Sequence, residues 1–325
     1  MSNLDESAEP VSYEASMPLE KILAHLPSNA NNRLHRDKMA EALFGDSKIP
    51  RAAFTDHKLM QLIMDPNTEL ESLAECIKMD PGLNLKIVRM SRTALYTRGE
   101  ETRSFEDAFY RIGLKEIRKI VYADTVASSF RNFTIEVNWM DFWRRAVLKA
   151  QLTEKLLKAA LGNKNFGFIS GILNDTGSLL IMEYLPEQYA EIAGLIDSGH
   201  AKDLAEKSVL HFTHAHVAGV LCLKWRFPYD VAMGIYYHHS DLSRVDDVIN
   251  VELYARAGLS AEHLADLSLR VIDEGLDIDE LDTYYAGNEW AELTDLIEDK
   301  EVLMGIDLEK EIESATNMAN ILTTG

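Results

Sequence analysis

The sequence predicts an all-α protein. Apolar residues recur three and four positions apart in successive segments, as the helix expected at Leu70–Lys78 shows with Leu70, Leu73, Ala74 and Ile77. Asp-Pro steps and single glycines separate these segments, which is how helices are commonly interrupted. No alternating run of apolar and polar residues bounded by hairpin turns stands out, so strands are not expected.

The expected helices follow one another with short connections. After a flexible leader of about 16 residues, one short helix begins near Pro18 and a second ends at Gly45. Ser104 precedes two acids and Gly113 precedes Lys115-Glu116, so both positions predict helix starts. The remaining helices are expected at Lys58–Met64, Leu70–Lys78, Leu83–Met90, Phe105–Ile112, Leu114–Phe130, Phe142–Leu161, from about Asp203 to Trp225, and at Tyr229–Tyr237.

Three parts are expected along the chain. Residues 1–45 form an N-terminal leader with short helices, residues 46–258 a multi-helix domain, and residues 259–325 an acidic helical C-terminal extension. From Val271 onward the extension carries 16 Asp and Glu against 2 Lys. Any disorder of the extension is expected to be confined to its final few residues, in TNMANILTTG. Its docking face is expected to use Leu264, Leu267, Leu269, Ile272 and Leu276.

Composition excludes several classes of protein. A net charge of -20 disfavours binding to nucleic acids and anionic membranes by repulsion. No apolar run reaches the ~18 residues of a membrane span, and the acidic start MSNLDESAEP is unlike a secretory signal. The chain has only two cysteines, Cys76 and Cys222, which argues against a disulfide framework or a cysteine zinc site. We therefore expect a cytoplasmic protein.

Residues with metal-ligating chemistry gather between Gly171 and Ser240. The stretch contains Asn174-Asp175, His214 and the pair His238-His239. Histidine and aspartate are common metal ligands, so metal-assisted hydrolysis is one interpretation. The other is structural: His214 lies on a seam with Leu210, Val217 and Leu221, where a histidine is usually a hydrogen-bonded core residue.

Taken together, these segments resemble the HDOD domain family, a bacterial signalling relative of the HD-domain phosphohydrolases, over roughly Ile49 to Gly258. Each motif alone is weak, and their order and spacing carry the resemblance. The motifs are Ile49-Pro50, Asp80-Pro81-x-Leu83, the segment Ser104–Leu114, Phe142-Trp143, GILNDTG at Gly171–Gly177, His214-Ala215 followed by Trp225 and Phe227-Pro228, and His238-His239.

The resemblance also exposes departures from an active HD site. Where the hydrolases begin their metal set with a histidine, this chain has Arg145, and their His-Asp pair is Asn174-Asp175. No aspartate near Val248–Ala257 offers the last ligand. Arginine stays protonated and cannot ligate a metal, so we expect Arg145 to pair with Asp175 in place of the ion. The expected vestigial pocket consists of Arg145, Asn174, Asp175, His214, His238 and His239, without catalytic residues, bound metal or cofactor.

The resemblance implies a non-catalytic bacterial signal-transduction module that acts through contacts with protein partners, with no nucleic-acid or membrane partner. A homodimer is left open. Two alternatives remain: a metal-dependent phosphohydrolase acting on a nucleotide or cyclic dinucleotide, and a small-anion sensor that uses the vestigial pocket through Arg145.

Overall fold

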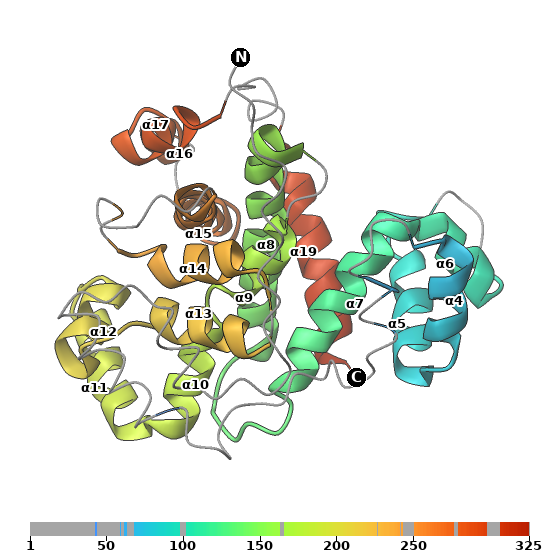
Figure 1. Cartoon of the computed structure of the whole chain (residues 1–325), viewed down its shortest axis with the longest axis horizontal. Helices are drawn as coiled ribbons and strands as arrows, with labels where there is room; N and C mark the ends of the chain where they lie inside the picture. Colours follow the sequence, from blue (N-terminus) through green and yellow to red (C-terminus); the bar gives the residue numbers. More distant parts are fainter. Residues whose placement is uncertain are drawn as a thin grey trace.

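Every regular element in the described part of this computed structural model is a helix, so the predicted all-α fold is confirmed (Figure 1). The structure describes residues 43, 59, 62–63, 68–97, 102–162, 166–225, 227–240, 242, 250–275, 279–297 and 306–324. The leader and the two helices expected before Gly45 lie outside these residues, as does most of Lys58–Met64. The described part contains no helix with the length and apolarity that a membrane crossing requires.

The helices with described boundaries run from α4 to α19. They are α4 (Leu70–Lys78), α5 (Pro81–Ser91), α6 (Phe105–Ile112), α7 (Leu114–Ser129), α8 (Trp139–Leu161), α9 (Gly167–Leu173), α10 (Thr176–Tyr184), α11 (Pro186–Asp197), α12 (Lys202–Leu210), α13 (His214–Lys224), α14 (Tyr229–Tyr237), α15 (Val251–Asp273), α16 (Asp279–Tyr285), α17 (Asn288–Thr294) and α19 (Leu308–Thr323).

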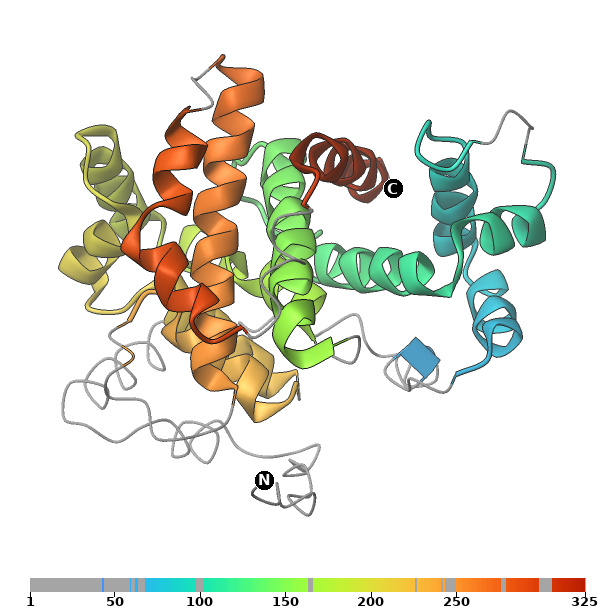
Figure 2. The ribbon, with the colours of Figure 1, turned by 90° about the horizontal axis from the view of Figure 1, so that it is seen from above.

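Helix α8 is the centre of the larger body, and α4–α6 form a separate lobe beside it (Figure 1). α7 leads from this lobe to the body, and α8 contacts α9, α15 and α19. Seen from above, α8 lies between α15 and α19 (Figure 2). Its buried faces are therefore shared between two helices that come much later in the chain.

Local sequence signals set the helix boundaries much as expected. The Ser104 hydroxyl accepts a hydrogen bond from the backbone N–H of Asp107 at 3.1 Å, which caps α6. Asp80 caps α5 in the same way, with Pro81 in the first turn. Gly113 and Gly162 adopt positive φ angles of 83° and 68°, where the lack of a Cβ removes the strain. These glycines separate α6 from α7 and end α8.

The single helix expected from Asp203 to Trp225 is wrong. The chain forms α12 and α13, because His211 adopts a left-handed conformation with φ 64° and ends α12. The backbone N–H of Thr213 then donates to Nδ1 of His216 at 2.9 Å, as part of a capping box that starts α13. Breaking the helix makes His214 the first residue of α13 rather than a residue in the middle of a long helix.

The C-terminal part is built into the body rather than appended to it. The division expected at residue 258 falls inside α15. α19 packs against α8, where Nε2 of Gln151 donates to Oγ of Ser314 at 2.7 Å. The segment TNMANILTTG is helical to Thr323, because its apolar residues, such as Met318 and Leu322, are buried and hold α19 in place.

Two of the five residues expected for the C-terminal docking face are confirmed as buried. Leu264 is 0 % and Leu269 7 % exposed, and both face the core. Leu267 is only partly buried, and Ile272 is 48 % exposed, so Ile272 is not a docking residue. Leu276 lies outside the described residues.

Candidate functional site

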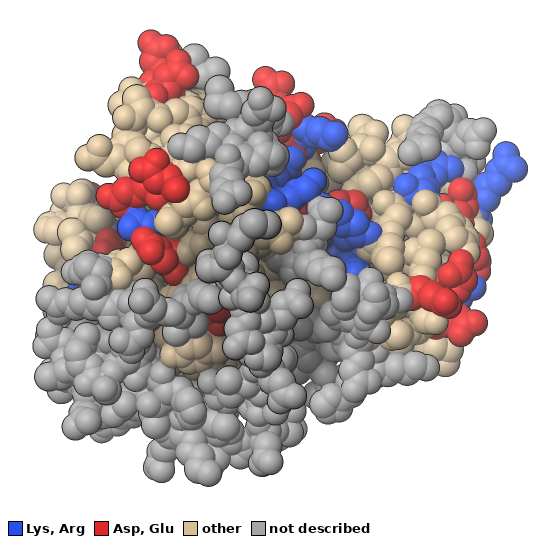
Figure 3. All heavy atoms as spheres, turned by 45° about the horizontal axis from the view of Figure 1, so that its top comes forward, with Lys and Arg blue, Asp and Glu red and all other residues tan. Residues whose placement is uncertain are grey.

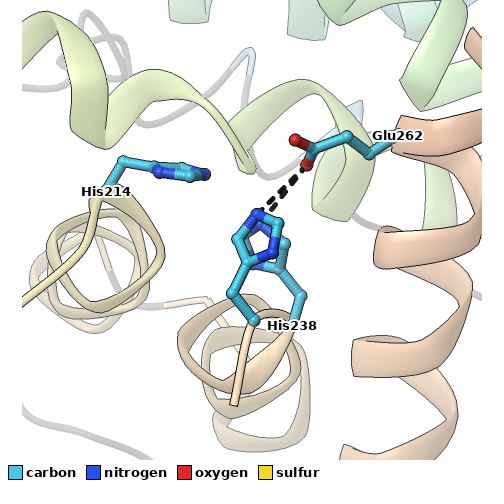
Figure 4. Close-up of side chains that lie close together, drawn as sticks. His214, His238 and Glu262 are labelled. Carbon is cyan, nitrogen blue, oxygen red and sulfur yellow. Dashed lines mark ion pairs between the residues drawn. The ribbon is translucent and has the colours of Figure 1, made fainter. Parts of the chain in front are cut away.

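Four side chains from three parts of the fold converge beneath α15. His214 begins α13, His238 and His239 follow the end of α14, and Glu262 comes from the middle of α15 (Figure 4). One ligand atom from each lies within 4.8 Å of the others. Oε2 of Glu262 is 3.6 Å from Nε2 of His238 and 3.4 Å from Nε2 of His239. Only the histidines were expected in the pocket from the sequence.

Neighbouring groups hold two of the rings with Nε2 directed to the centre of this cluster. The Glu206 carboxylate accepts hydrogen bonds from the backbone N–H of His214 at 2.8 Å and from its Nδ1 at 2.7 Å. Nδ1 of His238 donates to the carbonyl oxygen of Ile235 at 2.6 Å. A proton on Nδ1 leaves Nε2 with a free lone pair, so both rings present an acceptor or ligand atom inward.

The converging atoms are buried and lack hydrogen-bond partners among the described residues. These atoms are Nε2 of His214, His238 and His239 and Oε2 of Glu262, although Oε2 of Glu262 also forms an ion pair with Lys149 at 3.1 Å. Buried polar atoms are normally paired, so three ring nitrogens directed at one carboxylate call for a ligand. Burial lowers the pKa of His238, and burial followed by the neighbouring His238 lowers that of His239 to about 4. The rings of His238 and His239 are therefore neutral at pH 7, as metal ligation requires.

This donor set fits one divalent transition metal ion. Imidazole nitrogens and a carboxylate oxygen suit Zn²⁺ and other first-row ions, and four ligands complete a tetrahedral zinc shell. Metal-ligating histidines usually donate their second nitrogen to a carboxylate or a backbone carbonyl, as His214 and His238 do here. The ligand count made from the sequence fell short because it lacked Glu262.

The neighbouring carboxylate, Asp175, forms ion pairs with two lysines. Nζ of Lys149, which is 1 % exposed, forms an ion pair with Asp175 and lies 3.1 Å from Oε2 of Glu262. Lys202 contacts the other oxygen of Asp175 at 3.1 Å. Burial acts to raise the pKa of Asp175, but Lys149 and then Lys202 outweigh it and hold the pKa well below its usual range. Asp175 is therefore an ionised member of an internal charge network.

The pairing expected between Arg145 and Asp175 is wrong. Arg145 forms its ion pair with Asp266 of α15, and both side chains are nearly half exposed. One helical turn further along α8, Lys149 points into the site and supplies the cation that we had assigned to Arg145. An anion sensor built on Arg145 loses its support, because the guanidinium serves a surface ion pair.

Asn174 and two glycines show how tightly the helices meet here. Asn174 is 1 % exposed, and neither its Oδ1 nor its Nδ2 has a hydrogen-bond partner among the described residues. A Cβ at Gly258 would come within 2.8 Å of Nδ2 of Asn174. A Cβ at Gly177 would come within 2.0 Å of the carbonyl oxygen of His214, so only glycine lets α10 approach α13 this closely.

The sequence analysis missed Lys149, Lys202, Glu206 and Glu262. A signal for Glu262 existed, because it interrupts a seam of small and apolar residues spaced four and three apart: Val251, Ala255, Gly258, Ala265 and Leu269. A charged residue on such a face must be paired or bind a ligand. Lys149 follows Arg145 by four residues and so lies on the same face of α8.

Solved structures share this architecture. An HDOD domain protein of unknown function from Geobacter sulfurreducens is 16% identical, with a TM-score of 0.69 over 95% of this chain and 100% of that one. A proposed signal transduction protein from Marinobacter aquaeolei is 19% identical, with a TM-score of 0.66 over 93% and 69%. A proposed phosphohydrolase from Shewanella amazonensis is 22% identical, with a TM-score of 0.62 over 85% and 95%. At these identities the likeness establishes the fold.

No curated protein matches the chain. The HDOD domain model matches residues 49–241, which is more than half of the sequence, and includes the histidines but not Glu262. The matched range agrees with the Ile-Pro start and the His-His pair on which the resemblance rested. This chain therefore belongs to the HDOD domain family.

Proposed function

We propose that this protein is a regulatory module of signal transduction that acts through protein contacts and binds one divalent transition metal ion without hydrolysing phosphoesters. The observation that supports the metal site is the convergence of four buried donor atoms from His214, His238, His239 and Glu262, which have no hydrogen-bond partner among the described residues. The role of the ion is structural or sensory, because the surrounding groups lack the features that phosphoester hydrolysis uses.

The argument against hydrolysis rests on Asp175 and Lys149. Metal-assisted hydrolysis needs a metal-activated water and cations that hold the phosphate, and in many phosphatases two ions share the work. Asp175 would help to hold such a second ion, but two lysines neutralise it. The asparagine at position 174 offers a weak neutral donor in place of an imidazole.

Elemental analysis of protein purified without chelator or metal-affinity tag tests the metal site. We expect about one equivalent of a transition metal, or one equivalent of Co²⁺ taken up by stripped protein with the visible absorption of a bound ion. Glu262→Gln should abolish uptake while Glu252→Gln, a 50 % exposed glutamate on the same helix, should not. Wild-type protein that takes up no ion from a Zn²⁺ or Co²⁺ titration would overturn the site.

The phosphohydrolase remains a second candidate because the same cluster could activate a water. Metal-loaded protein should be assayed with p-nitrophenyl phosphate and bis-p-nitrophenyl phosphate. Turnover that disappears in His214→Ala and persists in Glu252→Gln would establish a hydrolase and overturn the non-catalytic proposal. Metal uptake without turnover supports the regulatory module, and crosslinking in cell extract followed by mass spectrometry would then identify its protein partners or a homodimer.

A further inference from the structure

A cavity lies beside α8, and none of its lining residues belongs to the histidine cluster. It has a volume of about 450 Å³, where α7, α8 and the beginning of α19 meet the end of α6. Six cationic and three acidic side chains line it, although the chain as a whole carries a net charge of -20. Figure 3 shows blue side chains gathered in the middle of the described surface, between the lobe of α4–α6 and the larger body.

The acidic side chains of this cavity are already neutralised within it. Nζ of Lys119 lies 2.7 Å from Glu154 and 3.1 Å from Glu116, so one ammonium serves two carboxylates. Glu154 also pairs with Lys115 at 3.2 Å. The third acid, Glu311 of α19, pairs with Lys155 of α8 at 2.9 Å. Each carboxylate therefore has at least one cation of its own.

Two lysines remain as an unbalanced positive charge. Arg111 pairs with Asp107 at 3.3 Å, outside the cavity. Lys158 and Lys310 line the cavity, are exposed, and form no ion pair with a described residue. Positive charge at the mouth of a hollow attracts anions, and low-dielectric walls strengthen the effect. The cavity therefore favours a ligand with negative charge.

The floor of the cavity adds a second requirement. Gln151 is 3 % exposed, and its Nε2 donates to Oγ of Ser314 at 2.7 Å. Its Oε1 is buried and has no hydrogen-bond partner among the described residues. An amide oxygen can only accept, so a ligand that satisfies it must carry a hydroxyl or amino donor. An inorganic anion without a hydroxyl group, such as sulfate, would leave this acceptor unpaired.

We propose that this cavity binds a phosphorylated small molecule of mononucleotide size. Lys158 and Lys310 hold the phosphate, which lysine binds as a compact charge, and Gln151 accepts a hydrogen bond from a hydroxyl or amino group of the ligand. The volume lies within the range of about 300–1,000 Å³ typical of small-molecule sites. The site is independent of the metal cluster and of the proposed function, and its ligand would join helices from three parts of the chain.

Isothermal titration calorimetry with AMP, GMP, CMP and UMP tests the site, and inorganic phosphate and adenosine serve as part-ligands. We expect at least one nucleotide to bind more tightly than either part-ligand. The double variant Lys158→Glu/Lys310→Glu should weaken binding at least about tenfold. Arg270→Glu, a charge reversal on α15 outside the cavity, should leave it unchanged. Unfolding curves of each variant establish that the fold is kept.

A separate variant tests whether Gln151 accepts a hydrogen bond from the ligand. Gln151→Leu keeps the size of the side chain but removes the acceptor, so it should weaken nucleotide binding more than phosphate binding. Absence of heat with all four nucleotides at millimolar concentration would overturn the proposal. So would binding that the double charge reversal leaves unchanged, or inorganic phosphate that binds as tightly as every nucleotide.

Discussion

The two halves of the buried site differ in how they satisfy their polar groups. On one side, Asp175 is neutralised by Lys149 and Lys202, so that half needs nothing from solution. On the other side, Lys149 reaches only the carboxylate of Glu262, and three imidazole nitrogens face that carboxylate without hydrogen-bond partners among the described residues. A charged side chain can thus replace an ion in one half of a pocket while the adjacent half keeps the donor set of a metal site.

The largest expected effect comes from removing the internal cation. Lys149→Met should destabilise the protein by about 3–5 kcal/mol, because it leaves buried carboxylates without their main counter-charge. Urea denaturation of metal-free protein measures the change. Lys115→Met, whose side chain is 61 % exposed, should cost no more than about 0.5 kcal/mol. A loss below about 1 kcal/mol for Lys149→Met would contradict the contrast between the halves.

Zinc binding tests the half of the site that contains the three histidines and Glu262. At a free concentration of about 100 times its Kd, zinc should raise the free energy of unfolding by about 2.7 kcal/mol. Glu206→Gln weakens the acceptor that orients His214, so affinity should fall about 10- to 100-fold and the same zinc should stabilise by roughly half or less. Asp203→Asn on the same helix is the control. Equal stabilisation in both variants would exclude Glu206 as a positioning residue.

The ion pairs of Glu154 with Lys119 and Lys115 are more exposed to solvent than those of Asp175, and their contribution to stability depends on pH. Burial acts to raise the pKa of Glu154, but Lys119 and Lys115 outweigh it and lower the pKa below its ordinary value of 4.5. Because the folded state then binds this proton less readily than the unfolded state, its stabilisation is present above pH 4.5 and is lost as the pH falls further.

Glu154→Gln should therefore destabilise the protein by roughly 1–2 kcal/mol at pH 7 and by less below pH 4.5. Chemical denaturation of wild type and variant across this range measures the difference. A difference that grows as the pH falls would contradict the assignment of an ionised Glu154 in the folded state.

The smallest expected effect is that of substituting Arg145, which the sequence predicts as the internal cation. Arg145→Ala should change the free energy of unfolding by no more than about 0.5 kcal/mol, because its pair with Asp266 is nearly half exposed and screened by water. Thermal and urea unfolding would detect a larger change. A loss comparable to that of Lys149→Met would mean that the guanidinium, and not the ammonium, is the internal cation.

More of the fold than of the candidate site could be predicted from the sequence. Periodicity and caps such as Ser104 predicted the helices, because these signals are local. His214, His238 and His239 were chosen by motif and do converge. The two lysines and Glu206 were missed because their partners are 8 to 27 residues away and only packing brings them together. The internal cation, Lys149, lies one helical turn from the expected Arg145, a difference that a motif comparison cannot resolve.

The packing of α19 against α8 has a consequence for how the protein is made. More than 160 residues separate the paired Gln151 and Ser314, so a ribosome has produced α8 long before α19 exists. Until residue 323 has been synthesised, the face of α8 that α19 covers stays open to solvent. A contact between such distant residues forms only after both helices have been made. During that interval the nascent chain exposes apolar surface of α8, and exposed apolar surface of this kind favours aggregation.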